Sequence, residues 1–380
     1  MTTPACIDGT LVIEIADGWS AGAVAGRLLS ELGARVIKIE PPEGDRLRHL
    51  GPGADGRSSA TFRNLNTNKE SIVLDLTTPA GRDALHGLAA KCDVLIADQT
   101  TLQDTGFDLD DGALTARNPG LVLCHFSPFG RSGPLAGQAG GDLMAQAMGG
   151  VIATTGHPGE LPHKAGPPLA VHNGALMGGT SILAALHERE RSGLGSVIDM
   201  ALHDGMVSLL YTFIPGYFIS GKAPGPQGNK HPMAAPWDNF PTKDGWVIIC
   251  MADDRQWRNF LDLIGKSDLA DDPRFATNDE RVRDDIRPLV DQLVIDFLAP
   301  MTTEVALKVL TEGQVPAGPI YDLKDLMTDP QFLERDMVVT LEDETGAAYR
   351  TPGTIFKMSE TPGRIYRRAP ALGEHGEIAP

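Results

Sequence analysis

Long apolar runs, closely spaced cysteines and an excess of basic residues are all missing from this 380-residue sequence. No apolar run reaches the roughly 20 residues that a membrane-spanning helix needs, and the start lacks the basic and apolar regions of a secretory signal. We therefore expect a cytoplasmic protein without a membrane helix. The four cysteines, Cys6, Cys92, Cys124 and Cys250, lie too far apart for a zinc or redox motif, so we expect reduced thiols and no metal.

Basic residues are too few to favour nucleic acid as a partner. The formal net charge is -17, whereas neutralising a phosphate backbone requires a basic face. A ligand that carries phosphate would need a local basic patch. The glycines between Gly18 and Gly22 follow the first predicted strand, but they lack the GxGxxG spacing of a dinucleotide loop.

Short apolar runs alternate with segments of helical spacing through the first half of the chain. Strands are predicted at 10–17, 35–40, 71–76, 93–98 and 121–127, and helices at 23–33, 79–91 and 109–117. Alternating strands and helices favour an α/β fold with an open, mostly parallel sheet and helices on both faces. We expect the first domain to occupy residues 1–221.

A second pattern follows a segment rich in proline and glycine at 222–237, which is typical of a linker. Residues 239–253 are predicted to form two strands joined at Lys243–Gly245, and helices are expected at 255–265, 280–298 and 303–312. We expect a small α+β domain at 238–315, with residues 316–380 returning to the first domain.

The segment from Gly166 to Gly195 is the centre of the functional prediction. Small residues recur at helical spacing between Asn173 and Leu186, which predicts a helix over 173–191 that packs closely against another backbone. The preceding loop is expected to end at His172. The amino end of a helix favours an anion or an anionic transition state, yet the adjacent residue is Val171, which has no reactive group.

Two other residues, Asp142 and His172, have both a catalytic and a structural interpretation. Asp142 begins a predicted helix at 142–148, where an aspartate is most often a cap. His172 titrates near neutral pH and is able to act as a base, but consecutive residues of a loop point in opposite directions, so we expect it to face away.

Several stretches together resemble the class III CoA-transferase family, which includes the carnitine CoA-transferases and the α-methylacyl-CoA racemases. They are LLSELGARVIKIEPPEGD, FRNLNTNKESIVLDLTTPAGR, GGDLMAQAMGG, LAALHERERSGLGSVIDMALHD, FPTKDGWVIICMADDRQW and LGEHG. The resemblance covers nearly the whole chain. It implies a large Rossmann-like domain, a small inserted domain and two chains interlocked as a dimer.

The resemblance also implies which residues would act. Family transferases carry an acyl group on an aspartate, and the match places Val171 at its position. The racemases add a histidine directly before an aspartate, where this chain has Gly141 before Asp142. CoA contacts are implied for Asn66, Lys69 and Lys38, but Pro41 and the expected loop 99–106 replace two basic positions.

Three hypotheses follow for coenzyme A chemistry on a small carboxylic acid or acyl-CoA. In the first, the chain is a non-catalytic subunit that pairs with a homologous catalytic chain as a heterodimer. In the second, it is a self-sufficient transferase or racemase, as a homodimer, that uses another carboxylate such as Asp142. In the third, it is an acyl-CoA lyase or isomerase with His172 as base.

Overall fold

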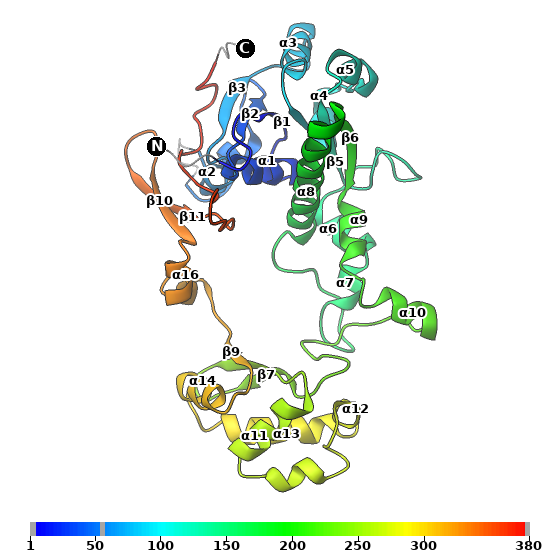
Figure 1. Ribbon diagram of the computed structural model, residues 1–380, viewed down its shortest axis with the longest axis vertical. Coiled ribbons are helices and arrows are strands. Elements are labelled where there is room, and N and C mark those ends of the chain that lie inside the picture. The colour runs from blue at the N-terminus through cyan, green and yellow to red at the C-terminus, as the bar shows by residue number, and fades with distance from the viewer. Residues whose placement is uncertain (1–4, 54–57, 377–380) are drawn as a thin grey trace. The chain divides into compact units, whose positions relative to one another are not determined.

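The computed structural model of the protein describes residues 5–53 and 58–376. Contacts divide the described residues into a larger unit, with residues 5–53, 58–153, 164–223 and 330–376, and a smaller unit, with residues 154–163 and 224–329. Each unit has its own hydrophobic core, and Figure 1 shows the helices and strands that form the two units. No sequence pattern marks residues 154–163 as part of the smaller unit, and the predicted boundaries at 221, 237 and 315 stay predictions.

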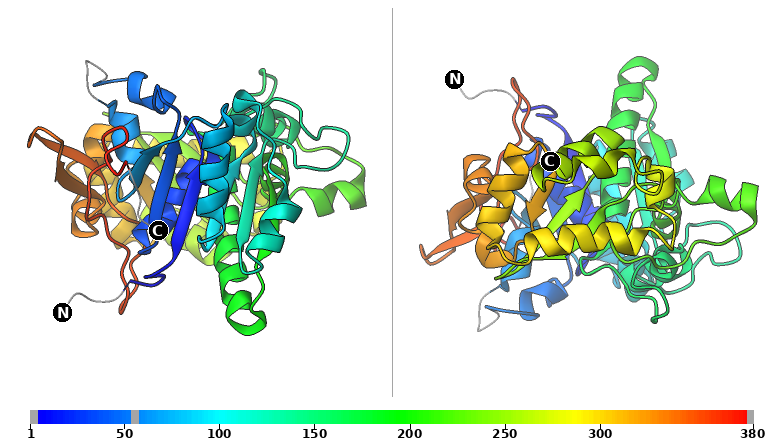
Figure 2. Two further views of the ribbon diagram at one scale, coloured as in Figure 1. Left: turned by 90° about the horizontal axis from the view of Figure 1, so that it is seen from above. Right: turned by 90° about the horizontal axis from the view of Figure 1, so that it is seen from below.

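A six-stranded parallel sheet forms the centre of the larger unit. Its spatial order is β3 (Glu70–Val73), β2 (Arg35–Glu40), β1 (Leu11–Ile15), β4 (Val94–Asp98), β5 (Val122–Ser127) and β6 (Ser196–Ala201). These strands lie side by side in the left view of Figure 2. The chain runs outward from β1 to β3 and then returns to begin β4 on the other side of β1. In open α/β sheets such a reversal leaves a crevice at the carboxyl ends of the two central strands.

Helices cover both faces of this sheet. One apolar cluster joins the sheet to α1 (Ala21–Glu31) and α8 (Leu169–Ser192), and a second joins it to α3 (Pro79–Ala89), α4 (Gln99–Thr105) and α5 (Asp111–Arg117). Strand β5 shows why both faces are apolar, since Val122 and Cys124 belong to the first cluster and Leu123 to the second. The predicted α/β fold with a parallel sheet is therefore confirmed.

The other elements of the larger unit are short. They are a 3-10 helix (Arg46–His49), α2 (Ala60–Leu65), α6 (Asp142–Met148), α7 (Val151–Thr154), α9 (Leu202–Ser208), α10 (Ile214–Ser220), α16 (Pro330–Glu334) and an antiparallel pair of β10 (Val338–Glu342) and β11 (Ala348–Pro352).

The segment 99–106, which we expected to be a loop, is mostly the helix α4. Its N-cap is Asp98, the last residue of β4, whose carboxylate accepts hydrogen bonds from the backbone N–H groups of Thr100 and Thr101 at 3.1 and 3.3 Å. The prediction of a loop was wrong because the capping residue belongs to the preceding strand.

Helix α8 begins at Leu169, four residues before the predicted start at Asn173, so the expected approach loop is its first turn. The sequence hides this start because Pro168 is the N-cap and makes no side-chain cap. The backbone N–H of Val171 instead donates to the Asp142 carboxylate at 3.1 Å. The helix ends at Gly193, whose φ is 74°, as predicted.

Close packing of α8 depends on glycine. A Cβ atom added at Gly178 would overlap the ring of Phe126 on β5, whereas the same atom at Gly179 would meet nothing within 4 Å. By length and composition alone α8 is also long and apolar enough to cross a membrane, with a mean hydropathy of 1.3. One side of the helix packs against α1 and β5, and 39% of its apolar window is buried.

The smaller unit is built on a three-stranded antiparallel sheet of β7 (Trp237–Pro241), β8 (Trp246–Cys250) and β9 (Ala317–Pro319). Its helices are α11 (Asp254–Leu263), a 3-10 helix (Ser267–Asp271), α12 (Asn278–Arg281), α13 (Arg287–Leu298), α14 (Thr303–Glu312) and α15 (Leu323–Leu326). The core is centred on fully buried side chains such as Trp257 and Phe260. The predicted hairpin and amphipathic helix are confirmed.

Candidate functional site

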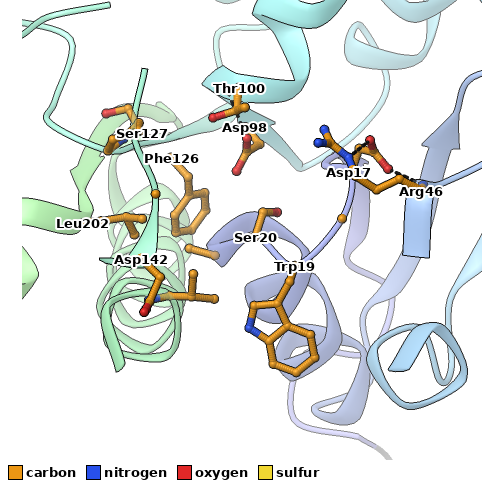
Figure 3. A pocket seen from close by; sticks show the side chains of 16 residues that line it. Asp17, Trp19, Ser20, Arg46, Asp98, Thr100, Phe126, Ser127, Asp142 and Leu202 are labelled. Carbon is orange, nitrogen blue, oxygen red and sulfur yellow. Dashed lines mark hydrogen bonds and ion pairs between the residues drawn. The ribbon is translucent and has the colours of Figure 1, made fainter. Parts of the chain in front are cut away.

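A cavity of about 160 Å³ lies at the carboxyl ends of β1, β4 and β5 in the larger unit. This is where the strand order reverses, the usual place for a ligand in such sheets. Its walls come from the loop after β1, the first residues after β4 and β5, the start of α6 and the first turn of α8. Figure 3 shows Asp98 and Ser20 on one side of this cavity and Asp142 on another. The cavity therefore brings together residues from distant parts of the chain.

Val171 lines the cavity from the first turn of α8. Its side chain is buried, with 3% of the residue exposed. A valine offers neither a nucleophile nor a proton. The structure thus places an inert side chain at the amino end of a 24-residue helix, where an anion would be favoured.

Asp142 also lines the cavity, and both of its carboxylate oxygens are engaged. Oδ1 accepts the Val171 N–H at 3.1 Å, and Oδ2 accepts a hydrogen bond from the Gln146 side chain at 2.6 Å. We expected Asp142 to cap its own helix. That detail was wrong, because Gly141 is the N-cap of α6 without a side-chain cap bond, and Asp142 caps α8 instead. The Asp142 carboxylate is thus in direct contact with the backbone of residue 171.

His172 lies on the exposed side of α8. Its Nδ1 contacts the carbonyl oxygen of Pro168 at 2.9 Å, and its ring centre is 5.8 Å from that of Trp19. His172 is not one of the described residues that line the cavity. The expectation that consecutive side chains alternate across a loop does not apply, because both residues belong to a helix.

Asp98 is a carboxyl group that the sequence analysis did not single out. It ends β4, lines the cavity and is buried. Burial raises its pKa to about 6 from an ordinary value of 3.8, although hydrogen bonds from Thr101, Ser20 and Thr100 oppose this rise. An acidic residue at the end of a predicted buried strand was the available signal. With a pKa of about 6, both the protonated and the ionised form of Asp98 are populated near neutral pH.

Arg46 is the single basic side chain among the described residues that line the cavity. It is not free, since its guanidinium pairs with Asp17 at 2.6 Å and with Asp104 at 3.0 Å. Burial and the nearby charge of Asp45 raise the pKa of Asp17, while the bond from Arg46 opposes that rise. The cavity therefore has no excess positive charge for an anionic cofactor.

Trp19 contributes an unused hydrogen-bond donor. Its indole Nε1 is buried and has no partner. Because an unpaired buried N–H is costly, a ligand with an oxygen acceptor would be favoured beside it.

The predicted CoA residues Lys38 and Lys69 lie elsewhere, in a buried ion network. Lys69 Nζ is 2.7 Å from a Glu14 carboxylate oxygen, and Lys38 Nζ is 3.3 Å from the other oxygen and 2.8 Å from Asp45. Both lysines are 0% exposed, as is Asn66, whose Oδ1 accepts a bond from Lys69.

The pKa values of the two lysines are shifted in opposite directions, because burial prevails at Lys69 and the carboxylates prevail at Lys38. Burial lowers the pKa of Lys69 to about 8, despite the opposing charge of Glu14. Burial acts in the same direction on Lys38, but the carboxylates of Asp45 and Glu14 outweigh it and raise its pKa. A CoA phosphate could reach either ammonium only by displacing a buried carboxylate, so the assignment of these residues to CoA stays a prediction.

No group of three or more metal-ligating side chains is found within residues 5–53 and 58–376. The cavity is therefore described by its carboxyl, hydroxyl and indole groups. Ser20, Thr100 and Ser127 supply the hydroxyls, and Ser127 already accepts the N–H of Gly130 at 2.8 Å.

Comparison with known proteins gives matches along nearly the whole chain. Residues 7–376 match the profile of CoA-transferase family III. The chain is 38% identical to succinate–glutarate CoA-transferase of Agrobacterium fabrum, covering 97% of this chain and 93% of the relative. It is 32% identical to the alpha subunit of succinyl-CoA–L-malate CoA-transferase of Chloroflexus aurantiacus, covering 97% and 86%. A CAIB/BAIF family protein from Brucella suis has a similar structure, with a TM-score of 0.84, 37% identity and 98% of each chain covered.

Proposed function

Because the chain belongs to CoA-transferase family III, we propose that it takes part in CoA transfer between an acyl-CoA and a small carboxylic acid as the subunit that does not carry the acyl group. Its partner would be a homologous catalytic chain, in the interlocked arrangement that the family resemblance implies. The observation that carries this proposal is Val171, which lines the cavity at the position implied for the nucleophile. A buried valine is unable to form an acyl anhydride.

The charge around the cavity supports the same proposal. Arg46 is held by two carboxylates, and no lysine or arginine occurs in the sequence between Lys91 and Arg117. Lys38 and Lys69 are committed to the buried network. CoA would therefore bind this chain weakly, and we propose that the partner supplies the tighter CoA site.

The names of relatives also support a paired enzyme. One relative is named as the alpha subunit of a malate CoA-transferase, so a division into subunits occurs among similar proteins. Succinyl-CoA and glutarate are suitable first probes, because another relative is named for succinate and glutarate. We retain the cytoplasm as the expected compartment.

Asp142 supports a second candidate function, a self-sufficient homodimeric transferase. Its carboxylate lies at the amino end of α8 in contact with residue 171, where a helix favours an anion. Against this role, hydrogen bonds from Val171 and Gln146 occupy both oxygens, and a nucleophile needs a lone pair directed at the acyl carbon.

One experiment separates the two functions. The purified chain is incubated with succinyl-CoA, alone and together with a homologue that carries aspartate at the position of Val171, and acyl-enzyme is detected by mass spectrometry. We expect acyl-enzyme on the homologue only, and transfer to glutarate only in the mixture. Robust transfer by the isolated chain would refute the subunit proposal, and its loss in Asp142→Asn would establish the second candidate.

Restoring the missing carboxylate gives an independent test. In Val171→Asp the new side chain lies beside Asp142, and two adjacent carboxylates oppose each other's ionisation. We expect a folded protein with at most a trace of acyl-enzyme, and more when Pro41→Arg adds a cation. Complete acylation of the single variant would show that CoA binds this chain well and that the subunit proposal is wrong.

A further inference from the structure

The chain enters helix α8 through a segment with few backbone donors. Pro167 and Pro168 precede the helix, and neither has an N–H group. Pro168 is the N-cap and makes no side-chain hydrogen bond to the first turn. The first turn of a helix leaves backbone N–H groups without a partner inside the helix. Partners for this turn must therefore come from elsewhere in the fold.

Two side chains of α6 supply hydrogen bonds on both sides of these prolines. Asp142 Oδ1 accepts the N–H of Val171 at 3.1 Å, on the helix side. Gln146 Oε1 accepts the N–H of Ala165 at 3.0 Å, on the loop side. Asp142 and Gln146 are four positions apart, so they lie on one face of α6. The pair therefore spans the entry of α8 with two hydrogen bonds.

A third hydrogen bond fixes the pair itself. Gln146 Nε2 donates to Asp142 Oδ2 at 2.6 Å. A carboxylate accepts and a backbone N–H donates, so these two partners permit only one orientation of the Gln146 amide. Gln146 is 0% exposed and does not line the cavity, whereas Asp142 does. Gln146 therefore acts on the cavity only through Asp142.

We propose that Gln146 is a positioning residue, which holds the Asp142 carboxylate so that Asp142 in turn fixes residue 171 at the wall of the cavity. The family resemblance implies position 171 for the acyl carrier, and the pair sets the geometry of that position whichever side chain occupies it. The inference rests on the proposed function in one respect, because it assigns Asp142 to positioning and not to carrying the acyl group.

Exchanging the two functional groups tests the proposal. In Asp142→Asn two amides face each other, so at least one of the three hydrogen bonds is lost. In Gln146→Glu two carboxylates face each other and repel. The double variant Asp142→Asn with Gln146→Glu keeps all three bonds, because the asparagine amide donates to the glutamate and both outer acceptors remain. Comparing the four proteins measures the coupling of the pair.

Methyl NMR of the full-length chain, with labelled valine methyl groups, reports the position of residue 171. The Val171 signals are assigned by their loss in Val171→Ala. We expect them to shift in each single variant and to return to the wild-type positions in the double variant.

The pH provides a second rescue. Lowering it from about 8 to about 5 should move the signals of Gln146→Glu back toward the wild type, because a proton shared by two carboxylates restores their hydrogen bond. Asp17, Asp98 and Arg46 line the same cavity, so the pH series of the wild type is subtracted.

The matched control is a second pair of the same two residue types, Gln292 and Asp296 on α13. They are also four positions apart, and Gln292 Nε2 donates to Asp296 Oδ1 at 2.7 Å. Both residues are exposed and belong to the smaller unit. Gln292→Glu adds the same charge as Gln146→Glu and should leave the Val171 signals unchanged at both pH values.

Transfer from succinyl-CoA to glutarate separates positioning from acyl carriage. The assay uses whichever preparation is active, the chain alone or the chain with its homologue. The double variant removes the carboxylate at position 142 without removing a hydrogen bond, so we expect it to keep the wild-type rate within about threefold. If Asp142 carried the acyl group, the double variant would be inactive, because an asparagine amide is not a nucleophile.

Three results would overturn the proposal. The first is wild-type Val171 signals in both single variants. The second is signals that stay displaced in the double variant, which remains measurable even if a single variant does not fold. The third is a double variant with wild-type signals that has lost the transfer activity. Lack of transfer in every preparation would refute the proposed function instead, and the Val171 signals would still decide the role of Gln146.

Discussion

Replacing Asp98 by asparagine tests how this buried carboxyl affects the stability of the protein. The folded pKa is about 6 against an ordinary value of 3.8, so ionising Asp98 costs the folded state up to about 3 kcal/mol. Because the folded pKa is raised, the fold is most stable when Asp98 is protonated. Stability is lost as the pH rises from about 4 through about 6. Asparagine has no charge to bury and is an equally good N-cap for α4.

We therefore expect Asp98→Asn to be more stable than the wild type at pH 8, by about 1 to 3 kcal/mol. The difference should shrink toward zero near pH 4, where the wild-type carboxyl is protonated. Thermal unfolding followed by circular dichroism between pH 4 and 8 measures this, and about 1 kcal/mol corresponds to a few degrees in a unit of this size.

The matched control is Asp110→Asn. Asp110 is the exposed N-cap of α5 and accepts the N–H of Ala113 at 2.9 Å. The same exchange should change stability there by only a few tenths of a kcal/mol at every pH. Equal stability of Asp98→Asn and the wild type at pH 8, or a gap that does not vary with pH, would refute the reasoning.

Two further predictions concern the packing of the larger unit. Gly178→Ala should destabilise the larger unit by about 1 to 3 kcal/mol, because the added methyl group overlaps the Phe126 ring. Gly179→Ala should be neutral or stabilise α8 by up to about 1 kcal/mol. Urea unfolding measures both variants, and an equal loss of stability in the two would contradict the described packing. Lys69→Met should lower the stability by about 3 to 5 kcal/mol, since Glu14 loses its nearer buried partner. In the same assay the control Arg35→Met, which breaks a more exposed ion pair with Glu70, should lower it by at most about 1 kcal/mol.

The sequence was sufficient to predict most of the secondary structure, because local patterns encode it. Short runs rich in β-branched or apolar residues, such as Arg35–Glu40 and Val122–Ser127, are largely buried strands, and they can be recognised without any partner. The end of α8 at Gly193 was predictable for the same reason, since a left-handed residue after a helix favours glycine. The lack of a reactive group at position 171 was also evident from the sequence alone, because a valine side chain is inert in any fold.

Only the tertiary structure decided what the polar residues do. Asp142 caps a helix that begins 27 positions later in the chain, so no local pattern around Leu169 marks the helix start. The sequence around Lys38 and Lys69 does not show that these lysines are buried. The fold places Glu14 in contact with both of them and buries all three side chains.

The same reason applies to the cavity. Asp98 acquires its raised pKa because the fold buries the end of β4, and the hydrogen bond from Ser20, which comes from another loop, only partly opposes this rise. Burial and electrostatics depend on everything within a few ångströms, and those neighbours are set by chain topology. Residue spacing along the sequence therefore fixed the elements, whereas the folded arrangement alone fixed their charges and contacts.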